Sequence, residues 1–318
     1  MATKALVEWD LGHKLHRVWR GLVRDWRAEL KSAGKSAATL RIYTTAVHHL
    51  VAYLISIDEL CEPEEVTKSH IRGLFAYLID TRSKGTANTS YRALRPFSKF
   101  LKSEDEITKS PMEGTTQPKL DPDAKPTPVV SDLDTNKLLK ACSGRTVLDL
   151  RDKAIILFLW DTGVRRAEIA GLAVEDINLE LNVAMVTGKG GKSRIVRFGA
   201  KTAKALARYL RVRSKLVLAH LRALWLGVTG RGPLKAISIL HMIKRRAVQA
   251  GISTDIWVHM LRHTFAHNYR MAGGNDSDLM VLGGWSTIKQ LERYGKSAAS
   301  MRAIEAHSRL SLSDRLSV

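Results

Sequence analysis

The sequence predicts a mainly helical protein with one small β-sheet, built as a helical N-terminal domain and a mixed α/β C-terminal domain. Amphipathic helical patterns account for most of the N-terminal third. Five of the eight prolines fall between residues 110 and 130, which is typical of an extended linker. In the C-terminal part, two β-rich runs flank a glycine-rich turn, whereas the remaining patterns are helical.

Four helices are expected in the N-terminal domain, because apolar residues recur there every three or four positions and gather on one face of each segment. Thr67 or Ser69 is suited to cap the third helix, since a hydroxyl oxygen can accept from the first backbone N–H groups. Four such helices can enclose one core. The apolar residues lie within 18–30, 40–54, 71–78 and 91–101.

The domain limits follow from the prolines. We expect the helical domain over residues 1–110, the linker over 111–130, the mixed domain over 131–300 and a C-terminal tail over 301–318. The tail has an amphipathic pattern of its own. A chain of 318 residues is long enough for two domains with separate cores.

The mixed domain is expected to contain a buried helix. The run RDKAIILFLWDT, residues 151–162, ends at Gly163, and glycine suits the left-handed conformation that follows a helix. A hairpin is expected over 183–198, where the β-rich runs flank the glycines. Further helical patterns lie at about 200–226, 235–250, 259–272, 276–282 and 286–293.

Charge is the most informative feature of the composition. The net charge is +20 and the pI is near 10.1. Residues 185–270 hold 18 Lys and Arg but a single acid, Asp255. A solvated face is the alternative, but like charges this dense would repel one another without a polyanion such as duplex DNA. The candidate DNA contacts are Lys192, Arg194, Lys244, Arg245 and Arg246.

Composition also excludes several classes of protein. Aromatic residues make up 6% of the chain, too few for a stacking platform that binds single strands. Cys61 and Cys142 alone cannot form a disulfide framework, which indicates a reducing compartment. The longest apolar run, residues 154–160, is far shorter than a membrane span, and the N-terminus lacks a signal-peptide core. We therefore expect a cytoplasmic protein with no membrane partner.

Two short stretches place charged side chains at turns. In TGVRRAEI, residues 162–169, Arg165 and Glu168 lie one turn apart at the start of a helix, which alone would suit a surface ion pair. In TGKGGKSR, residues 187–194, the glycines predict a hairpin tip that carries Lys189 toward a polyanion. The stretch lacks the spacing of a phosphate-binding P-loop.

The stretch HMLRH, residues 259–263, allows two interpretations. Its histidines, four residues apart, share one helical face, which is the spacing of a zinc-binding helix. A zinc protease would need a glutamate directly after the first histidine, and Met260 stands there. Because no third ligand can be nominated, we expect no metal at this position. His259 and Arg262 then remain candidates for other chemistry.

The stretch LGGWSTIKQLERYGK, residues 282–296, places Trp285 and Tyr294 nine residues apart. Taken alone, both aromatic side chains suit a core. Together, however, the four stretches resemble one family, the tyrosine recombinases or lambda-type integrases. The family pattern is T-G-x-R-x-x-E, a hairpin lysine, H-x-x-R, then His or Trp, and a nucleophilic tyrosine. This chain has every element in that order, and its helical part resembles the family's core-binding domain, in a short form without an arm-binding domain.

The resemblance implies an enzyme that cleaves and rejoins DNA. Tyr294 would attack a phosphodiester and leave a 3′-phosphotyrosine, which keeps the bond energy, so that neither a cofactor nor a metal is required. Arg165 and Arg262 would bind the phosphate oxygens, where charge develops in the transition state. Lys189 would protonate the departing 5′ oxygen, and His259 would assist proton transfer at the tyrosine.

The remaining matched residues have supporting roles in this expectation. Trp285 stands where many family members have histidine. Because an indole N–H can donate a hydrogen bond but cannot transfer a proton, positioning and packing are expected of it. Glu168 would orient the arginine or histidine side chains, and His263 would pack beside them.

The resemblance also implies partners. Strand exchange involves two DNA sites, so we expect a homotetramer on paired sites, with the 301–318 tail either contacting a neighbouring protomer or covering its own domain. Host accessory or directionality factors would join it. The short form resembles integrases of phages and mobile elements, which would place the protein at the nucleoid of a bacterial host.

Two other functions stay open. A type IB topoisomerase shares the covalent chemistry but relaxes supercoils as a monomer. A DNA-binding protein without catalytic activity would need only the basic block and not the motif residues. The complete set of motif positions favours the recombinase over both.

Overall fold

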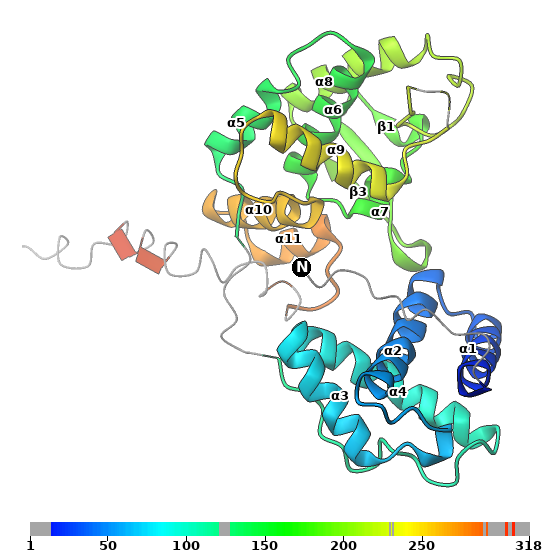
Figure 1. Cartoon of the computed structure of the whole chain (residues 1–318). Helices are drawn as coiled ribbons and strands as arrows, with labels where there is room; N and C mark the ends of the chain where they lie inside the picture. Colours follow the sequence, from blue (N-terminus) through cyan, green and yellow to red (C-terminus); the bar gives the residue numbers. More distant parts are fainter. Residues whose placement is uncertain are drawn as a thin grey trace, which may run out of the picture. The chain divides into compact units, whose positions relative to one another are not determined.

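The computed structural model shows a chain of two compact units, Met1–Ala124 and Lys125–Val318, each with a hydrophobic core of its own (Figure 1). The residues that it describes are 14–120, 128–228, 230, 232–288, 291, 303–304 and 307–308, with only the backbone at Lys189. Among the helices in those ranges, none has both the length and the apolar character that a bilayer span requires.

The first unit is the predicted bundle of four helices. Trp19 and Trp26 fill its core, with ring centroids 6.4 Å and 4.8 Å from that of Phe97. Thr67 caps the third helix, as predicted, because its hydroxyl accepts from the backbone N–H of His70. The helices are α1 (Lys14–Ser32), α2 (Ala37–Ser56), α3 (Lys68–Thr81) and α4 (Lys84–Ser103), with a 3₁₀ turn at Pro63–Glu65.

The end of this unit differs from the prediction. Residues 111–120, expected in an extended linker, pack on the helical bundle. Met112 is buried in its core, and the side-chain amide of Asn88 donates to the backbone oxygen of Pro118 at 2.7 Å. A count of prolines does not reveal such contacts, because proline suits packed turns as well as free linkers. The rest of the predicted linker is described only at residues 128–130, where Val130 joins the core of the second unit.

The second unit is built around a central helix, α6 (Val147–Thr162), whose Ile155, Ile156 and Phe158 are fully buried. The helix ends at Gly163, which adopts the predicted left-handed conformation with φ 56° and ψ 24°. The helices around it are α5 (Asp132–Lys140), α8 (Ala200–Arg213), α9 (Ala236–Gln249) and α10 (Val258–Met271). Two shorter helices are α7 (Arg166–Ala170) and α11 (Asp276–Gly283).

One antiparallel sheet of three strands, in the order β1-β2-β3, lies in this unit. The predicted hairpin is formed by β2 (Val183–Thr187) and β3 (Ser193–Arg197), in a register that pairs Val186 with Arg194. Its turn, Lys189–Gly191, contains two glycines with φ of 76° and 74°, a region that favours glycine. Strand β1 (Ile177–Asn178) was not predicted, since two residues are too few to show an alternating pattern.

The structure corrects one predicted helix. The helical pattern at 200–226 breaks at Arg213, where α8 ends. The Arg213 guanidinium is turned inward and donates to four backbone oxygens of the following loop, at 2.6 to 3.2 Å. These hydrogen bonds hold residues 219–224 in a non-helical path. The apolar spacing alone did not reveal them, because their acceptors are backbone groups.

Candidate active site

Strand β3 and the ends of three helices bring most of the predicted site residues together. Arg165 precedes α7 and Glu168 lies within it, Arg194 lies in β3, and His259, Arg262 and His263 lie in α10. Trp285 follows α11, which contacts both α10 and β3. Figure 1 shows these elements on one side of the second unit.

Glu168 is the centre of the cluster, and its side chain is only 2% exposed. Its carboxylate accepts two hydrogen bonds from the Arg194 guanidinium, at 3.0 and 2.8 Å. It accepts two more from Arg165, one from Nη1 at 2.8 Å and one from the backbone N–H at 2.7 Å. Burial acts to raise the pKa of this carboxyl, but the hydrogen bonds from Arg194 and Arg165 outweigh it and lower the pKa to about 2. Glu168 is therefore ionised at neutral pH.

Three successive carbonyl groups at the end of α11 each bind a different arginine. The last carbonyls of a helix lack partners inside the helix and carry the negative end of its dipole, so they attract guanidinium groups. The pairs are Arg194 Nε with Leu282 O at 2.8 Å, Arg262 Nη2 with Gly283 O at 2.7 Å, and Arg165 Nη2 with Gly284 O at 2.7 Å. We call residues 282–284 the carbonyl row; it joins β3, α10 and the start of α7 at one point.

Arg262 is deeply buried, with 1% of its surface exposed. Besides its bond to the carbonyl row, it donates from Nη1 to Gly163 O, at the end of α6, at 2.7 Å. Its guanidinium also lies over the Trp285 ring, 4.0 Å from the ring centroid. Carbonyl oxygens and an aromatic face both favour a cation, so these contacts fix the position of the charge.

His259 and His263 lie next to each other on α10, with ring centroids 5.4 Å apart. Burial, followed by the charges of Arg262 and Arg165, lowers the pKa of His259 from 6.5. Burial, His259 and Arg262 lower the pKa of His263 to about 4. Both imidazoles are therefore predominantly neutral at pH 7. A neutral imidazole can accept a proton from a nucleophile.

The side chain of Arg165 reaches the surface. It is 38% exposed, whereas the side chain of Arg194 is 12% exposed. The base of the hairpin lies close to it. A Cβ atom at Gly188 would be 3.1 Å from the Glu168 Oε1 atom. Lys189 is the next residue, in the turn of the hairpin. The hairpin is thus held near the exposed arginine by the same carboxylate.

The predicted nucleophile, Tyr294, lies outside the described residues, as does most of the 301–318 tail. The sequence places Tyr294 ten residues after Gly284, the last member of the carbonyl row. The predicted helix at 286–293 is described only in part.

Two predicted DNA contacts, Arg194 and Arg246, point into the protein, which corrects their assignment to a DNA-binding surface. The Arg246 side chain is 7% exposed. It donates to the carboxylates of Asp149 and Asp152 and to the backbone oxygen of Ala141, each at 2.9 Å. Arg194 is held by Glu168 and Leu282, as described above. Sequence composition places arginines in a basic block without showing which carboxylates face them from other helices.

The three other predicted DNA contacts are more accessible. Lys192 is exposed beside the hairpin turn. Lys244 is 46% exposed and lies 2.9 Å from a carboxylate oxygen of Asp255. Arg245 is 48% exposed and lies 2.9 Å from the buried carboxylate of Asp152. Of the five residues, Lys192 is the one that lies closest in sequence to the hairpin turn.

The internal role of Arg194 and the carbonyl row were not predicted from the sequence. Backbone acceptors leave no trace in side-chain identity. The Gly283–Gly284 pair is the signal that could have indicated them. A Cβ atom at Gly283 would lie 1.8 Å from the Trp285 ring, and one at Gly284 would lie 3.0 Å from the Arg194 guanidinium. Neither position has room for a side chain without a shift of the arginine cluster or the ring.

Comparisons with known proteins cover both units. The phage integrase family matches residues 129–301, and the phage integrase N-terminal SAM-like domain matches residues 22–106. The tyrosine recombinase XerD of Corynebacterium glutamicum is 31% identical over 288 residues, which is 86% of this chain and 93% of the relative.

Two solved structures have a similar fold. The lambda integrase dimer bound to a COC′ core site has a TM-score of 0.68 and 18% identity, over 88% of this chain and 77% of that chain. The lambda integrase tetramer bound to a Holliday junction has a TM-score of 0.65 and 17% identity, over 84% and 77% of the two chains.

Proposed function

This chain belongs to the phage integrase family, that of the tyrosine recombinases, and on that premise we propose that it cleaves and rejoins duplex DNA through the arginine cluster around Glu168. The observation that carries this assignment of the site is the meeting of Arg165 and Arg262 at the end of α11, with His259 close enough that, besides burial, the charges of both arginines lower its pKa. The sequence pattern separates these residues by almost a hundred positions, and the fold brings them together.

Arg165 is the residue that we assign to direct contact with the scissile phosphate. Its side chain reaches the surface, while Glu168 and Gly284 hold the guanidinium in one orientation. Arg262 lies deeper, bound by two carbonyl oxygens, and adds a fixed positive charge beneath the phosphate site. A preorganised charge of this kind stabilises the negative charge that develops on the phosphate oxygens.

Two residues are assigned to proton transfer. His259 would accept the proton of the attacking tyrosine, because burial and the neighbouring arginines favour its neutral form. Lys189, in the hairpin turn, would give a proton to the departing 5′ oxygen. His259 would act on the attacking tyrosine and Lys189 on the departing oxygen. Both side chains must therefore lie within reach of the phosphate that we assign to Arg165.

Tyr294 would form the covalent bond. Its phenolic oxygen attacks the phosphorus, the bond to the 5′ oxygen breaks, and that oxygen takes up the proton. The reverse reaction, with the 5′ hydroxyl of another strand, restores the tyrosine and rejoins the DNA. The proposal needs no group other than those of this chain and the DNA.

Duplex DNA is the proposed partner, and a homotetramer on two paired sites is the proposed assembly. The net charge of +20 supports the first part, since phosphate contacts release counterions from the duplex. The fold shared with the lambda integrase tetramer on a Holliday junction supports the second. The biological role that we propose is movement of a phage or mobile element in a bacterial host, with host accessory factors. An attachment site beside the gene would support this role.

A suicide substrate tests the proposed chemistry. It is a duplex that carries the recombination site and a nick, so that the cleaved fragment diffuses away and the covalent complex accumulates. We expect an adduct with the wild-type protein and none with Tyr294→Phe. Without a wild-type adduct, the proposed activity is wrong. An adduct that persists in Tyr294→Phe means that another residue is the nucleophile. Relaxation of supercoiled DNA without any recombination site would favour a topoisomerase.

A further inference from the structure

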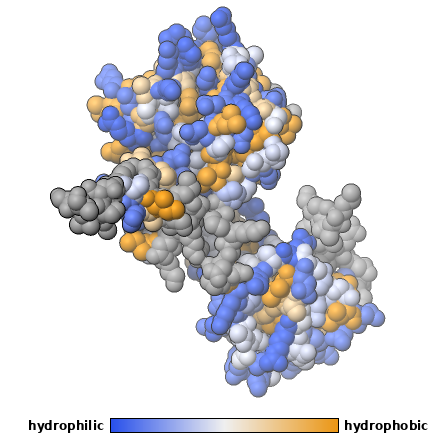
Figure 2. All heavy atoms as spheres, turned by 90° about the vertical axis from the view of Figure 1, so that its left-hand side faces the viewer, coloured by the Kyte–Doolittle hydropathy of each residue, from blue (hydrophilic) through white to orange (hydrophobic). Residues whose placement is uncertain are grey.

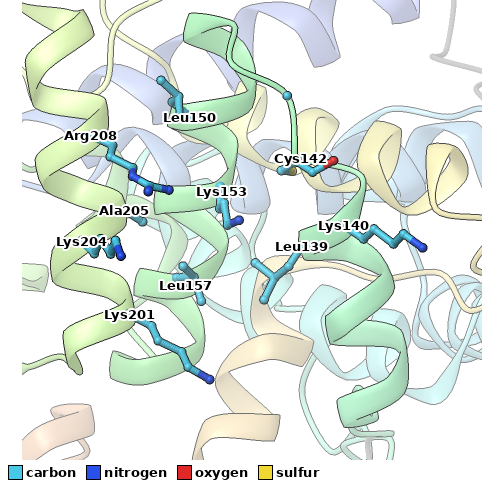
Figure 3. A pocket seen from close by; sticks show the side chains of 12 residues that line it. Leu139, Lys140, Cys142, Leu150, Lys153, Leu157, Lys201, Lys204, Ala205 and Arg208 are labelled. Carbon is cyan, nitrogen blue, oxygen red and sulfur yellow. The ribbon is translucent and has the colours of Figure 1, made fainter.

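We propose that a basic groove between α5 and α8 binds an acidic peptide segment of a partner protein. The groove lies over α6 and has a volume of about 420 Å³ (Figure 3). Among the described residues that line it, none belongs to the candidate active site. The groove is therefore separate from the residues assigned to the DNA reaction.

The floor of the groove is apolar. Leu150 and Leu157 lie seven residues apart on one face of α6, and Leu139 of α5 and Ala205 of α8 complete the floor. The three leucines are only partly buried, so their side chains are accessible to a ligand. Partly exposed leucines in a concave site are suited to receive the apolar side chains of a partner.

Five cations surround this floor. Three of them lie at spacings of three and four residues on α8, which places them in a row about 10 Å long on one face of the helix. Figure 3 shows this row on α8 and Lys153 on the neighbouring helix α6. The five are Lys140, Lys153, Lys201, Lys204 and Arg208.

The groove differs from other basic parts of the same unit. On α9, Lys244 pairs with Asp255, and Arg245 and Arg246 both pair with Asp152. Among the described side chains, no carboxylate lines the groove or lies within 4.0 Å of any of its five cations. Like charges that converge on one apolar floor repel one another, and an anionic partner removes this repulsion.

The row of cations on α8 and the apolar floor of the groove together indicate the chemistry of the partner. A single small anion cannot reach cations spread over about 10 Å, whereas acidic residues along a peptide can. Duplex DNA presents phosphates and sugars, which leave Leu150 and Leu157 uncovered. The tail 301–318 carries three arginines against two acids, so its charge does not match the groove. An acidic segment with apolar anchor residues matches both features.

Fluorescence anisotropy with the full chain tests the proposal. The probe is a fluorescein-labelled peptide in which glutamates alternate with leucines. One control peptide has serine in place of each leucine, and the other has serine in place of each glutamate. We expect saturable binding of the parent peptide alone. If the peptide without leucines binds equally well, the cations act only as a diffuse field and the proposal is wrong.

Variants locate the binding. Lys153→Glu and Leu157→Glu should each weaken binding of the parent peptide by about tenfold. Lys31→Glu, on the exposed end of α1, changes the net charge as Lys153→Glu does and should leave binding unchanged. Circular dichroism confirms that each variant folds. An equal loss in Lys31→Glu would overturn the proposal.

Competition and cleavage separate the groove from the DNA site. Excess duplex DNA should not displace the peptide, and Lys153→Glu should cleave the suicide substrate at the wild-type rate. Displacement by duplex DNA would assign the groove to nucleic acid and overturn the proposal. So would sedimentation that shows a wild-type dimer which Lys153→Glu dissociates, because the occupant would then be a second copy of this chain.

Discussion

Arg194 and Glu168 form a bidentate ion pair inside the second unit, with both guanidinium Nη atoms bound to the two carboxylate oxygens. The same guanidinium donates from Nε to Leu282 O. Arg194 therefore ties the hairpin to α7 and to the carbonyl row. Because Lys189 lies on this hairpin and Arg165 shares the Glu168 carboxylate, the pair determines how the hairpin sits relative to the arginine that we assign to the phosphate.

We predict that Arg194→Lys slows DNA cleavage by roughly 100-fold while DNA binding stays near wild type, since a displacement of about 1 Å at the reacting groups has that effect. Lysine keeps the charge but lacks the planar fork with which Arg194 binds both carboxylate oxygens of Glu168 and the backbone oxygen of Leu282. Single-turnover cleavage and a binding titration on the same site measure the two quantities.

A modified substrate shows through which group Arg194 acts. When sulfur replaces the bridging 5′ oxygen, the leaving group is a thiolate, which departs without protonation because a thiol is far more acidic than an alcohol; the thiol of cysteine, for comparison, has a pKa of about 8.5. If Arg194 positions Lys189, this substrate should restore most of the lost rate. An unrestored rate would mean that the variant disturbs Arg165 instead.

Glu168→Gln should lower the free energy of unfolding of the second unit by about 3 kcal/mol, because it leaves two guanidinium groups without their buried carboxylate. The folded pKa of Glu168 is about 2, below its ordinary value of 4.5. Its stabilisation is thus complete above pH 4.5 and is lost as the pH falls from there toward 2. Denaturant titrations of both proteins at several pH values measure this difference. A difference that does not shrink in acid would contradict it.

The elements with strong periodicity could be predicted from the sequence, and the contacts that end or redirect them could not. The apolar face of each helix in the first unit and the glycine at 163 are local signals, and both were correct. Arg213 ends α8 through backbone oxygens up to eleven residues away. Residues 111–120 pack through Met112 and Pro118. Such contacts depend on which groups the fold brings together.

The same distinction holds for the site. The family pattern predicted a shared site for Arg165, His259 and Arg262, because the expected chemistry requires side chains of these types around one phosphate. It did not identify Arg194 as an internal residue, since one arginine in a basic block looks like any other until its carboxylate is known. The carbonyl row was equally hidden, because every residue has a backbone oxygen and only the fold shows which ones accept from arginines.

The pH dependence of cleavage should reflect the neutral state of His259. Burial and two arginines lower its pKa from 6.5, so the base form persists as the pH falls to 6.5 and is lost only below it. We expect the cleavage rate to stay level from neutral pH down to 6.5 and then to decline. His259→Gln should reduce the rate by roughly 100-fold and abolish the decline. A wild-type rate that already falls above pH 6.5 would contradict this assignment.

Substitutions at Trp285 separate its two capacities, packing and hydrogen-bond donation. The ring lies 4.0 Å from the Arg262 guanidinium and is 6% exposed. Trp285→Phe keeps an aromatic face over the arginine but has no N–H group. If packing is the main role, this variant should retain cleavage within about tenfold of wild type, since stacking on the guanidinium is kept.

Trp285→Ala should lower the free energy of unfolding by about 3 kcal/mol or more and lose most of the cleavage rate, because it leaves a cavity beside Arg262. Thermal melts and single-turnover cleavage of both variants give the comparison. A Trp285→Phe protein that is as stable as wild type but as inactive as Trp285→Ala would show that the reaction needs the indole N–H group itself.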